Sequence, residues 1–344
     1  MTFPSLDARA VRICERAAEA WWGWRGHGES AVPLSVIAAI CLADGINPKA
    51  LLEAGDDEVV KGIGEAWAMF WLRRPDLCIR CGPLADWLND DPLDPGLVRA
   101  AAAVARAAVK AGICDVLGHT EYVDLLGHAY IAMRSRPAAQ ARGEYYTPAA
   151  VCEVMARMIL TGDLTPGMSI AEPAAGTGGM LRAAALVLRE RGQDPADFWW
   201  VVNDISPLVS AALAVNCHLW GLGHRVIVRA ANTLTEPDWP ASAWEEQRAA
   251  VAQRDTMLAS AALLAMATGA GRLAGEAAGT APAGPAPAVP DIELPGMPLS
   301  TGSPAKAAAP RRAAAPRREA AARRPSGSRA SSRNRPRQRA DGER

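Results

Sequence analysis

The chain has 344 residues, of which half are hydrophobic, and its basic and acidic residues are equal in number. This length suits about two domains and allows a sizeable core. No apolar run reaches the roughly 18 residues of a membrane span, and the N-terminus lacks a basic segment followed by an apolar one, so no membrane segment or secretory signal is expected.

The cysteines favour a reducing compartment. Seven cysteines, an odd number, are scattered from Cys14 to Cys217, which suits reduced thiols in the cytoplasm better than a disulfide framework. Cys78 and Cys81 form a Cys-x-x-Cys pair, but no second pair follows at zinc-site spacing. We therefore favour structural or incidental thiols over a metal or redox site and expect no metal.

Residues 1–135 have the spacing of helices. Apolar residues recur with helical periodicity, and the alanine-rich stretches favour well-packed helices. The predicted helices span Ala8–Trp22, Leu34–Leu42, Asp57–Leu72, Pro95–Ala111 and Tyr122–Met133. We expect an all-α N-terminal domain.

From residue 143 the pattern changes to strands that alternate with helices. Thr147-Pro148 predicts a helix start, since threonine caps and proline fits the first helical position. The predicted strands are Met168–Glu172, Trp199–Asp204 and Arg225–Ala230, and the helices run to about Leu160 and over Leu181–Arg191 and Leu208–Leu219. This alternation predicts a parallel, doubly wound sheet.

After Asn232 the strand pattern stops. Trp244–Leu264 predicts one helix, and from about Thr268 the chain is rich in alanine, glycine and proline. We expect a second domain over residues 136–265 and a tail over 266–344 that is disordered because it buries too little apolar surface.

Charge is unevenly distributed. From Pro304 to Arg344 there are 13 basic and three acidic residues, so the rest of the chain is acidic on balance. Arginine pairs in such a tail could neutralise the phosphates of a nucleic acid without recognising its base sequence. The alternative is a solvated, compositionally biased terminus, and the scarcity of aromatic residues argues against base stacking.

A glycine-rich turn lies between the first predicted strand and its helix. Gly176-Thr-Gly-Gly lets the backbone turn sharply and approach a ligand, and the preceding Glu172 could hold an ammonium group. Asp204 closes the second strand, where a carboxylate can accept both ribose hydroxyls. Asp204 could instead cap the next helix. A site for a nicotinamide dinucleotide would use the same kind of glycine-rich turn, but Leu181 stands where the dinucleotide motif has its third glycine.

Four motifs together resemble the N6-adenine DNA methyltransferases. They are Gly-Glu-Tyr-Tyr-Thr-Pro at 143–148, Glu-Pro-Ala-Ala-Gly-Thr-Gly-Gly-Met-Leu at 172–181, Asn-Asp-Ile-Ser-Pro at 203–207 and Ala-Asn-Thr-Leu at 231–234. The most similar group is the modification subunit of type I restriction systems and its phage-type relatives. Asp124-Leu-Leu-Gly-His-Ala-Tyr resembles the family's lead-in helix, so the resemblance covers about residues 122–235.

The resemblance implies a Rossmann-like fold, S-adenosylmethionine as cofactor and DNA as substrate. By position, Tyr145 to Pro148 would line the pocket, Glu172 and the Thr177–Gly179 turn would hold the methionine moiety, and Asp204 would take the ribose. Asn232 stands where the family has a residue facing the adenine amino group. The tyrosines could instead be core aromatics and Asn232 a turn residue. The expected cofactor-binding set is Glu144, Tyr145, Tyr146, Thr147, Pro148, Glu172, Pro173, Ala174, Gly176, Thr177, Gly178, Gly179, Asp204 and Asn232.

The catalytic motif of that family is missing. An Asn/Asp-Pro-Pro-Tyr/Phe sequence should follow the fourth strand and hold a flipped adenine, yet none of the 344 residues forms one, so no catalytic residue is assigned. Strands four to seven are also missing, which leaves a partial fold with an unpaired edge and the appearance of truncation before the motif.

Two functions remain from this pattern. One is a DNA adenine-N6 methyltransferase that needs a partner subunit to supply the catalytic segment or the specificity. The other is an inactive module that binds cofactor and DNA or a partner. A dinucleotide-dependent enzyme is disfavoured by Leu181 and by Tyr145 to Pro148.

Overall fold

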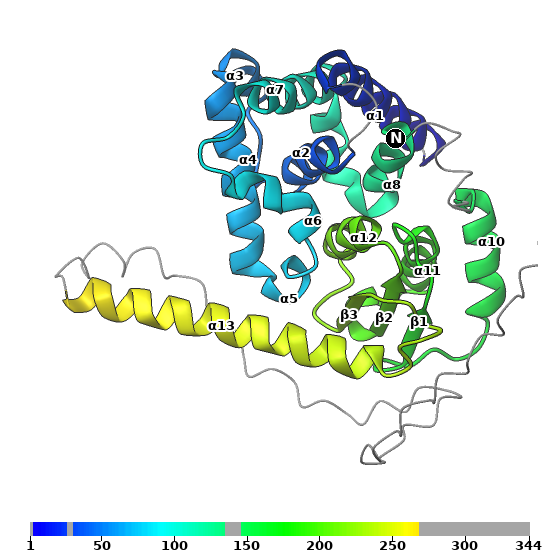
Figure 1. Cartoon of the computed structure of the whole chain (residues 1–344). Helices are drawn as coiled ribbons and strands as arrows, with labels where there is room; N and C mark the ends of the chain where they lie inside the picture. The colour runs from blue at the N-terminus through cyan, green and yellow to red at the C-terminus, as the bar shows by residue number, and fades with distance from the viewer. Residues whose placement is uncertain (1–2, 26–29, 135–145, 268–344) are drawn as a thin grey trace, which may run out of the picture. The chain divides into compact units, whose positions relative to one another are not determined.

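A small parallel sheet lies among helices in the computed structural model of the chain (Figure 1). The structure describes residues 3–25, 30–134 and 146–267, all within one compact unit that spans Met1–Met297. Among these residues, no helix combines the length and the apolarity that a bilayer crossing needs.

Helices make up the N-terminal part of the chain. They are α1 (Phe3–Arg25), α2 (Ala31–Leu42), α3 (Pro48–Glu53), α4 (Asp56–Arg73), α5 (Pro75–Cys78), α6 (Gly82–Ala85), α7 (Pro95–Lys110) and α8 (Leu125–Ala132), with 3-10 turns at Asp86–Asn89, Ile113–Asp115 and Leu117–Tyr122. The first four predicted helices are confirmed as α1, α2, α4 and α7. The short helices α3, α5 and α6 were not predicted, because four to six residues are too few to show periodicity.

The last predicted helix of this segment is shorter than expected. It was predicted over Tyr122–Met133, but α8 begins at Leu125. Val123 is extended, and the Asp124 side chain accepts a hydrogen bond from the Gly127 amide. An aspartate that caps a helix stands outside it, which accounts for the later start.

The three predicted strands form one sheet. β1 (Ser169–Glu172), β2 (Trp199–Asp204) and β3 (Val226–Ala230) are parallel and lie in the order β1-β2-β3. The connecting helices are α11 (Gly179–Glu190) and α12 (Pro207–Leu219). Ile170 of β1 stands opposite Trp200 of β2, which stands opposite Val226 of β3. The alternation predicted from sequence is therefore confirmed.

Both faces of β2 and β3 are buried. Trp200, Val202 and Val228 point into the large core that also contains α11 and α12. The opposite face packs on the final helix, α13 (Trp239–Ala267), in a separate cluster of Trp199, Val201, Ile227, Ala231, Trp239 and Ala243. Helices thus cover both sides of the sheet, as burial on both faces of a parallel sheet requires.

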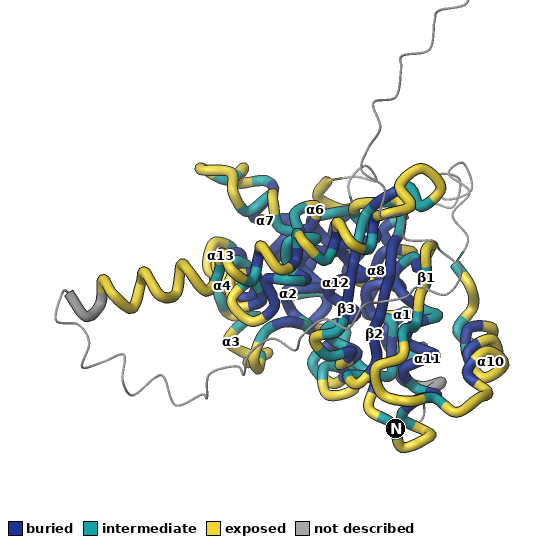
Figure 2. Tube along the Cα trace, turned by 90° about the horizontal axis from the view of Figure 1, so that it is seen from below, coloured by how far each residue is buried: buried dark blue, intermediate teal, exposed yellow. Residues whose placement is uncertain are grey.

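The N-terminal helices share the core of the sheet. α12 packs on one side against β2 and β3 and on the other against α2, α5 and α6. In Figure 2 much of α2, α8, α12, β2 and β3 is coloured as buried, and many of their buried residues belong to one core cluster. The domain boundary at residue 135 stays a prediction.

Two helices differ from their predicted bounds. α10 (Ala149–Ile159) begins after Pro148, and Thr147 makes no side-chain cap, so the predicted threonine cap is wrong. α13 begins five residues before the predicted Trp244 and ends after Leu264. Its second half projects with Met257, Leu258, Leu263 and Leu264 exposed (Figure 2).

The two edges of the sheet are unlike. On the outer edge of β3, the carbonyl of Val226 accepts from Gln247 Nε2 at 3.1 Å and the carbonyl of Val228 accepts from Arg80 Nε at 2.9 Å. Beyond β1, by contrast, no strand is found in the described part of the chain. Side chains thus close the β3 edge and leave the β1 edge open.

Candidate functional site

The glycine turn links the end of β1 to the start of α11. Gly176 has φ +58° and Gly178 has φ +101°, both in the left-handed region that glycine favours. A Cβ at Gly178 would lie 2.7 Å from Trp220 Cζ3 and 2.8 Å from Leu213 Cδ1. The turn needs glycine both for its backbone angle and for the space above α12.

Asp204 joins this turn to the end of β2. Its Oδ2 accepts from the Gly176 amide at 3.0 Å, and its Oδ1 accepts from the Ser206 amide at 2.9 Å. Ser206, not Asp204, is the N-cap of α12, because its side chain accepts from Val209. The structure therefore brings Asp204 and the glycine turn together at the carboxyl edge of the sheet.

Asn203 is a buried residue that sequence reasoning missed. Its Nδ2 donates to the carbonyls of Pro173 at 3.1 Å and Ala231 at 2.9 Å, so one side chain ties together the loops after β1 and β3. The Ala175 amide also donates to the Asn203 carbonyl at 2.8 Å. Two sequence signals pointed to Asn203: it is a polar residue at an inward position of a buried strand, and it opens the motif at 203–207, although no role was assigned to it.

Tyr146 lies over the glycine turn. Its Cε1 is 3.7 Å from where a Cβ of Gly176 would stand, and its ring centroid is 5.9 Å from that of Tyr130. Burial raises the pKa of Tyr146 well above its usual range, and the nearby Asp204 adds to this, so the phenol stays protonated. Thr147 and Pro148 follow it and are exposed. Glu144 and Tyr145 lie outside the described residues.

The segment between β1 and the glycine turn is open to solvent. Glu172 is half-buried, and its Oε1 accepts from the Ala174 amide at 3.2 Å. Pro173 and Ala174 are exposed. Thr177, by contrast, is buried and donates to Asp124, while Gly179 opens α11. Of the predicted residues here, Glu172 offers the charged group nearest the turn.

Asn232 forms a turn after β3. Its Oδ1 accepts from the Leu234 amide at 3.1 Å, and its carbonyl accepts from the amides of Thr235 and Glu236. The turn role considered from sequence is therefore present in the structure. Asn232 also follows the buried Ala231, at the same sheet edge as Asp204.

A thiol lies under the turn. Cys152 of α10 is buried, and its Sγ lies 3.6 Å from the carbonyl of Thr147 and 3.6 Å from a Cβ position at Gly179. Burial raises the pKa of Cys152. All seven cysteines are free thiols. Across the described residues, no group of three or more His, Cys, Asp or Glu side chains is arranged to hold a metal.

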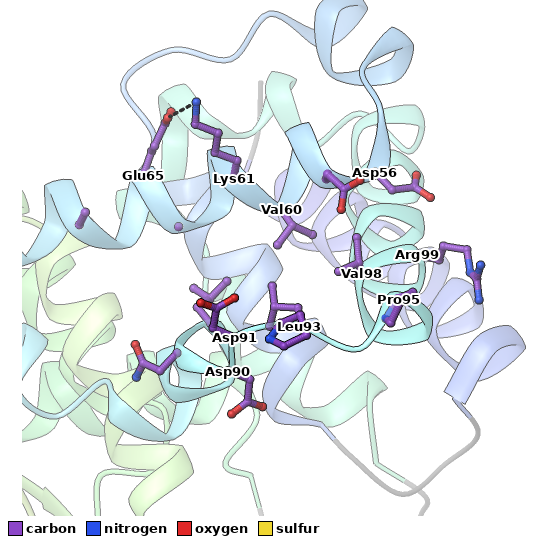
Figure 3. Close-up of a pocket in the computed structure, with 16 residues that line it drawn as sticks. Asp56, Val60, Lys61, Glu65, Asp90, Asp91, Leu93, Pro95, Val98 and Arg99 are labelled. Atoms are coloured by element: carbon purple, nitrogen blue, oxygen red, sulfur yellow. Dashed lines mark ion pairs between the residues drawn. The ribbon is translucent and has the colours of Figure 1, made fainter.

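A groove lies elsewhere, among the N-terminal helices. It has a volume of about 1010 Å³ and is lined by α4 and by the segment that leads into α7 (Figure 3). Lys61 pairs with Glu65 across one turn of α4 at 3.8 Å. Most of the charges are carboxylates, including Asp56, Asp90 and Asp91, and no serine, threonine, cysteine, histidine or tyrosine is among the lining residues. This groove has no chemistry that adds to the site at the sheet edge.

Comparisons with known proteins give a family. A model of the N-6 DNA Methylase family matches residues 121–254. The chain is also similar to the crystal structure of a type I restriction-modification system methyltransferase subunit from Streptococcus thermophilus, at 16% identity and a TM-score of 0.40. That similarity covers 70% of this chain and 60% of the subunit, so the chain spans less than two thirds of the subunit's length. No curated protein matches the sequence.

The family match covers the structural features described above. Residues 121–254 include the glycine turn, Asp204, Asn232 and the first half of α13, and they begin just before the cap of α8. This segment of the chain therefore matches the N-6 DNA methylase family.

Proposed function

We propose that this chain provides the S-adenosylmethionine-binding part of a DNA adenine-N6 methyltransferase and completes its active site with a partner chain. The observation that carries the proposal is the hydrogen bond from the Gly176 amide to Asp204 Oδ2, within a segment of the N-6 DNA methylase family. A Rossmann-like arrangement would place such a pair at the carboxyl edge of the sheet, where nucleotides bind.

The residues present fit this cofactor. Each oxygen of Asp204 accepts one amide hydrogen, and a carboxylate has about four acceptor sites. Capacity therefore remains for two ribose hydroxyls. Glu172 keeps one oxygen for the ammonium of the methionine moiety, and Gly176 exposes backbone beside Tyr146 without a side chain between them.

The remaining roles follow from position. Ile205, which sequence reasoning did not single out, is 67% exposed directly after Asp204 and offers an apolar surface to the adenine ring. Asn232 Oδ1 accepts one bond, from the Leu234 amide, and its second lone pair would accept from the adenine amino group. Thr177, Gly178 and Gly179 would shape the methionine end, with Tyr146, Thr147 and Pro148 along the side. These residues would hold the cofactor, which when bound would supply an electrophilic methyl group.

A partner is favoured by the sheet itself. The chain lacks the Asn/Asp-Pro-Pro-Tyr/Phe motif that should hold the target adenine. No strand lies beyond β1 among the described residues, and α10 lies on that side of the sheet in both views (Figures 1 and 2). The helix also carries an exposed apolar stripe. Its exposed members, at helical spacing, are Val151, Val154, Met155, Met158 and Ile159. A partner strand beyond β1 would cover both features.

DNA is the proposed substrate. The arginine pairs of the tail would contact its phosphates without sequence preference, and the partner would add sequence specificity. Free thiols throughout the chain suit a cytoplasmic enzyme. The second candidate function is a module that binds the cofactor and DNA or a partner without turnover, which the missing catalytic motif favours.

Calorimetric titration of S-adenosylmethionine into the purified chain tests the cofactor site. We expect saturable binding that Asp204→Ala abolishes and Asp238→Ala, a change of an exposed aspartate in the turn before α13, leaves intact. Absence of binding to the folded wild-type chain would contradict the proposal.

Methyl transfer separates the two functions. We expect the chain alone to leave duplex DNA unlabelled when given cofactor with a radioactive methyl group. Addition of the product of a neighbouring reading frame that carries Asn-Pro-Pro-Phe should label adenine N6. Cofactor binding without transfer in any such pairing would favour the non-catalytic module.

A further inference from the structure

The glycine turn is held from beneath by a carboxylate outside the predicted site. Asp124 Oδ2 accepts from the Thr177 hydroxyl at 2.9 Å. Asp124 Oδ1 accepts from Asn216 Nδ2 and from the Gly127 amide, each at 2.8 Å. One side chain therefore joins the turn, α12 and the first turn of α8.

The groups around these bonds are buried and closely packed. Thr177 and Asn216 are buried, and Asn216 Nδ2 also donates to the Thr177 carbonyl at 2.8 Å. A Cβ at Gly127 would lie 2.2 Å from Asp124 Oδ2 and 2.7 Å from Thr177 Oγ1. Gly127 thus lets the carboxylate reach the threonine directly.

The two residues before Asp124 are tied to the same unit. The carbonyl of Tyr122 accepts from Arg182 of α11 at 2.8 Å, and that of Val123 accepts from Trp220 Nε1 at 3.2 Å. Trp220 is the ring that a side chain at Gly178 would strike. Three successive residues are therefore bonded to the helices on either side of the turn.

Helix α8 connects this anchor to the N-terminal helices. His128 Nε2 lies 3.0 Å from Asp7 Oδ1 of α1, and Cys14 Sγ lies 3.5 Å from the Leu125 carbonyl. Six residues after Asp124, Tyr130 contacts the ring of Tyr146, which lies over Gly176. The N-terminal end of α8 thus touches Thr177 directly, and Tyr130 touches the ring that lies over the turn.

We propose that Asp124 is a positioning residue for the glycine turn, through which the N-terminal helices fix the shape of the methionine end of the site. The inference rests on the proposed function for the identity of the ligand only. Asp124 itself faces Thr177 and Asn216, not the ligand. Its removal should therefore act through the conformation of Gly176–Gly179.

A second aspartate gives a matched control. Asp94 caps α7 as Asp124 caps α8, accepting from the amides of Gly96 at 3.2 Å and Leu97 at 3.0 Å. Asp94 also accepts from Arg25 Nη1, on α1, at 3.0 Å. Asp94→Ala removes a helix cap without touching the turn, so it reproduces the loss of the cap in Asp124→Ala but not the loss of the buried bonds to Thr177 and Asn216.

Hydrogen–deuterium exchange and calorimetry together test the proposal. In the chain without ligand, we expect the amides of Gly176 and Gly178 to exchange about tenfold faster in Asp124→Ala than in Asp94→Ala. The affinity for S-adenosylmethionine should fall about tenfold in Asp124→Ala alone, because the hydrogen bonds to Thr177 and Asn216 are lost. A tenfold fall corresponds to about 1.4 kcal/mol.

Asp124→Asn tests positioning against charge. An asparagine keeps an acceptor for Gly127 and Asn216 and can donate to the Thr177 oxygen, so exchange and affinity should stay within about threefold of wild type. Equal losses in the Asn and Ala variants, or equal changes in Asp94→Ala, would overturn the proposal. If the wild-type chain binds no cofactor but exchange still rises only in Asp124→Ala, the proposed function fails and the positioning role stands.

Discussion

At the scale of single residues, the glycine turn is shaped by contacts on both sides. Asp204 accepts from the Gly176 amide on the side of β2, and Trp220 with Leu213 fills the space next to Gly178 on the side of α12. Both glycines have positive φ. A side chain at Gly178 therefore meets a conformational and a steric penalty together.

Replacement of Gly178 should destabilise the fold. We expect Gly178→Ala to lower the free energy of unfolding by about 2–5 kcal/mol, the sum of a left-handed alanine and an overpacked contact. Gly62 lies at an exposed position of α4 with open space around it. We expect Gly62→Ala to raise the free energy of unfolding by about 0.5–1 kcal/mol, measured by urea unfolding. Equal effects of the two substitutions would contradict this account.

A buried histidine makes stability depend on pH. Burial, and then the charge of Arg74, lower the pKa of His218 to about 4, and its ring packs 5.3 Å from that of Phe70. The unfolded chain binds this proton near pH 6.5. Between pH 6.5 and 4 the unfolded state therefore holds more protons at His218 than the folded state does. The contribution of the neutral His218 to the free energy of unfolding is complete above pH 6.5 and is lost as the pH falls toward 4.

The size of this effect is at most about 1.4 kcal/mol for each pH unit in that window. We expect urea unfolding at pH 7.5, 6 and 5 to show a smaller decline for His218→Phe than for wild type. His128 shifts the other way, because Asp7 outweighs the effect of burial and raises its pKa. The difference between variant and wild type isolates His218, and parallel pH profiles would refute its role.

At the scale of elements, the outer edge of β3 is closed by side chains. Gln247 of α13 bridges the carbonyls of Val226 and Asp76, each at 3.1 Å. Arg80 reaches Val228 and pairs with Glu246, whose pKa is lowered by Arg229 and Arg80 against the opposing effect of burial. These polar contacts attach α13 to the sheet beside its apolar cluster.

Truncation of Gln247 should loosen α13. Gln247→Ala leaves the buried carbonyl of Val226 and the half-buried carbonyl of Asp76 without this donor, so we expect the free energy of unfolding to fall by about 1–3 kcal/mol. Gln253→Ala, on an exposed face of the same helix, should change it by less than about 0.5 kcal/mol. Chemical denaturation of the two variants measures the difference directly.

Local sequence signals predicted the elements but not their long-range partners. The strands and the Gly176–Gly179 turn were predictable because strand residues, helix periodicity and glycines lie within one short stretch. The closure of β3 by Arg80 was not, because residues 80 and 228 are far apart in the chain. Asp124 resembled part of a family motif, yet its bond to Thr177 depends on how α8 packs.

At the scale of the whole molecule, the family segment and the N-terminal helices share one core. Phe70 of α4 packs on His218 of α12, and Cys81 Sγ lies 3.8 Å from the Ala211 carbonyl. Fold elements outside residues 121–254 therefore cover the outer face of α12. The catalytic segment, by contrast, was found neither in the sequence nor in the described residues.

A fragment of residues 121–267 should not fold as it does in the intact chain. Without α1 to α7, the outer face of α12 and much of α8 become exposed, which removes a large apolar contact area. We expect weak near-ultraviolet circular dichroism and a broad denaturant transition. A cooperative transition close to that of the full chain would mean that the predicted two-domain division is correct.

The reactivity of the Cys152 thiol can be used to measure motion at the site. It lies between α10 and the first residue of α11, out of reach of solvent and with a raised pKa. An alkylating reagent can therefore attack only while α10 is lifted from the glycine turn. The alkylation rate of Cys152, followed by mass spectrometry, should report how often the segment carrying Tyr146 separates from the turn, and a ligand that bridges the two should slow it.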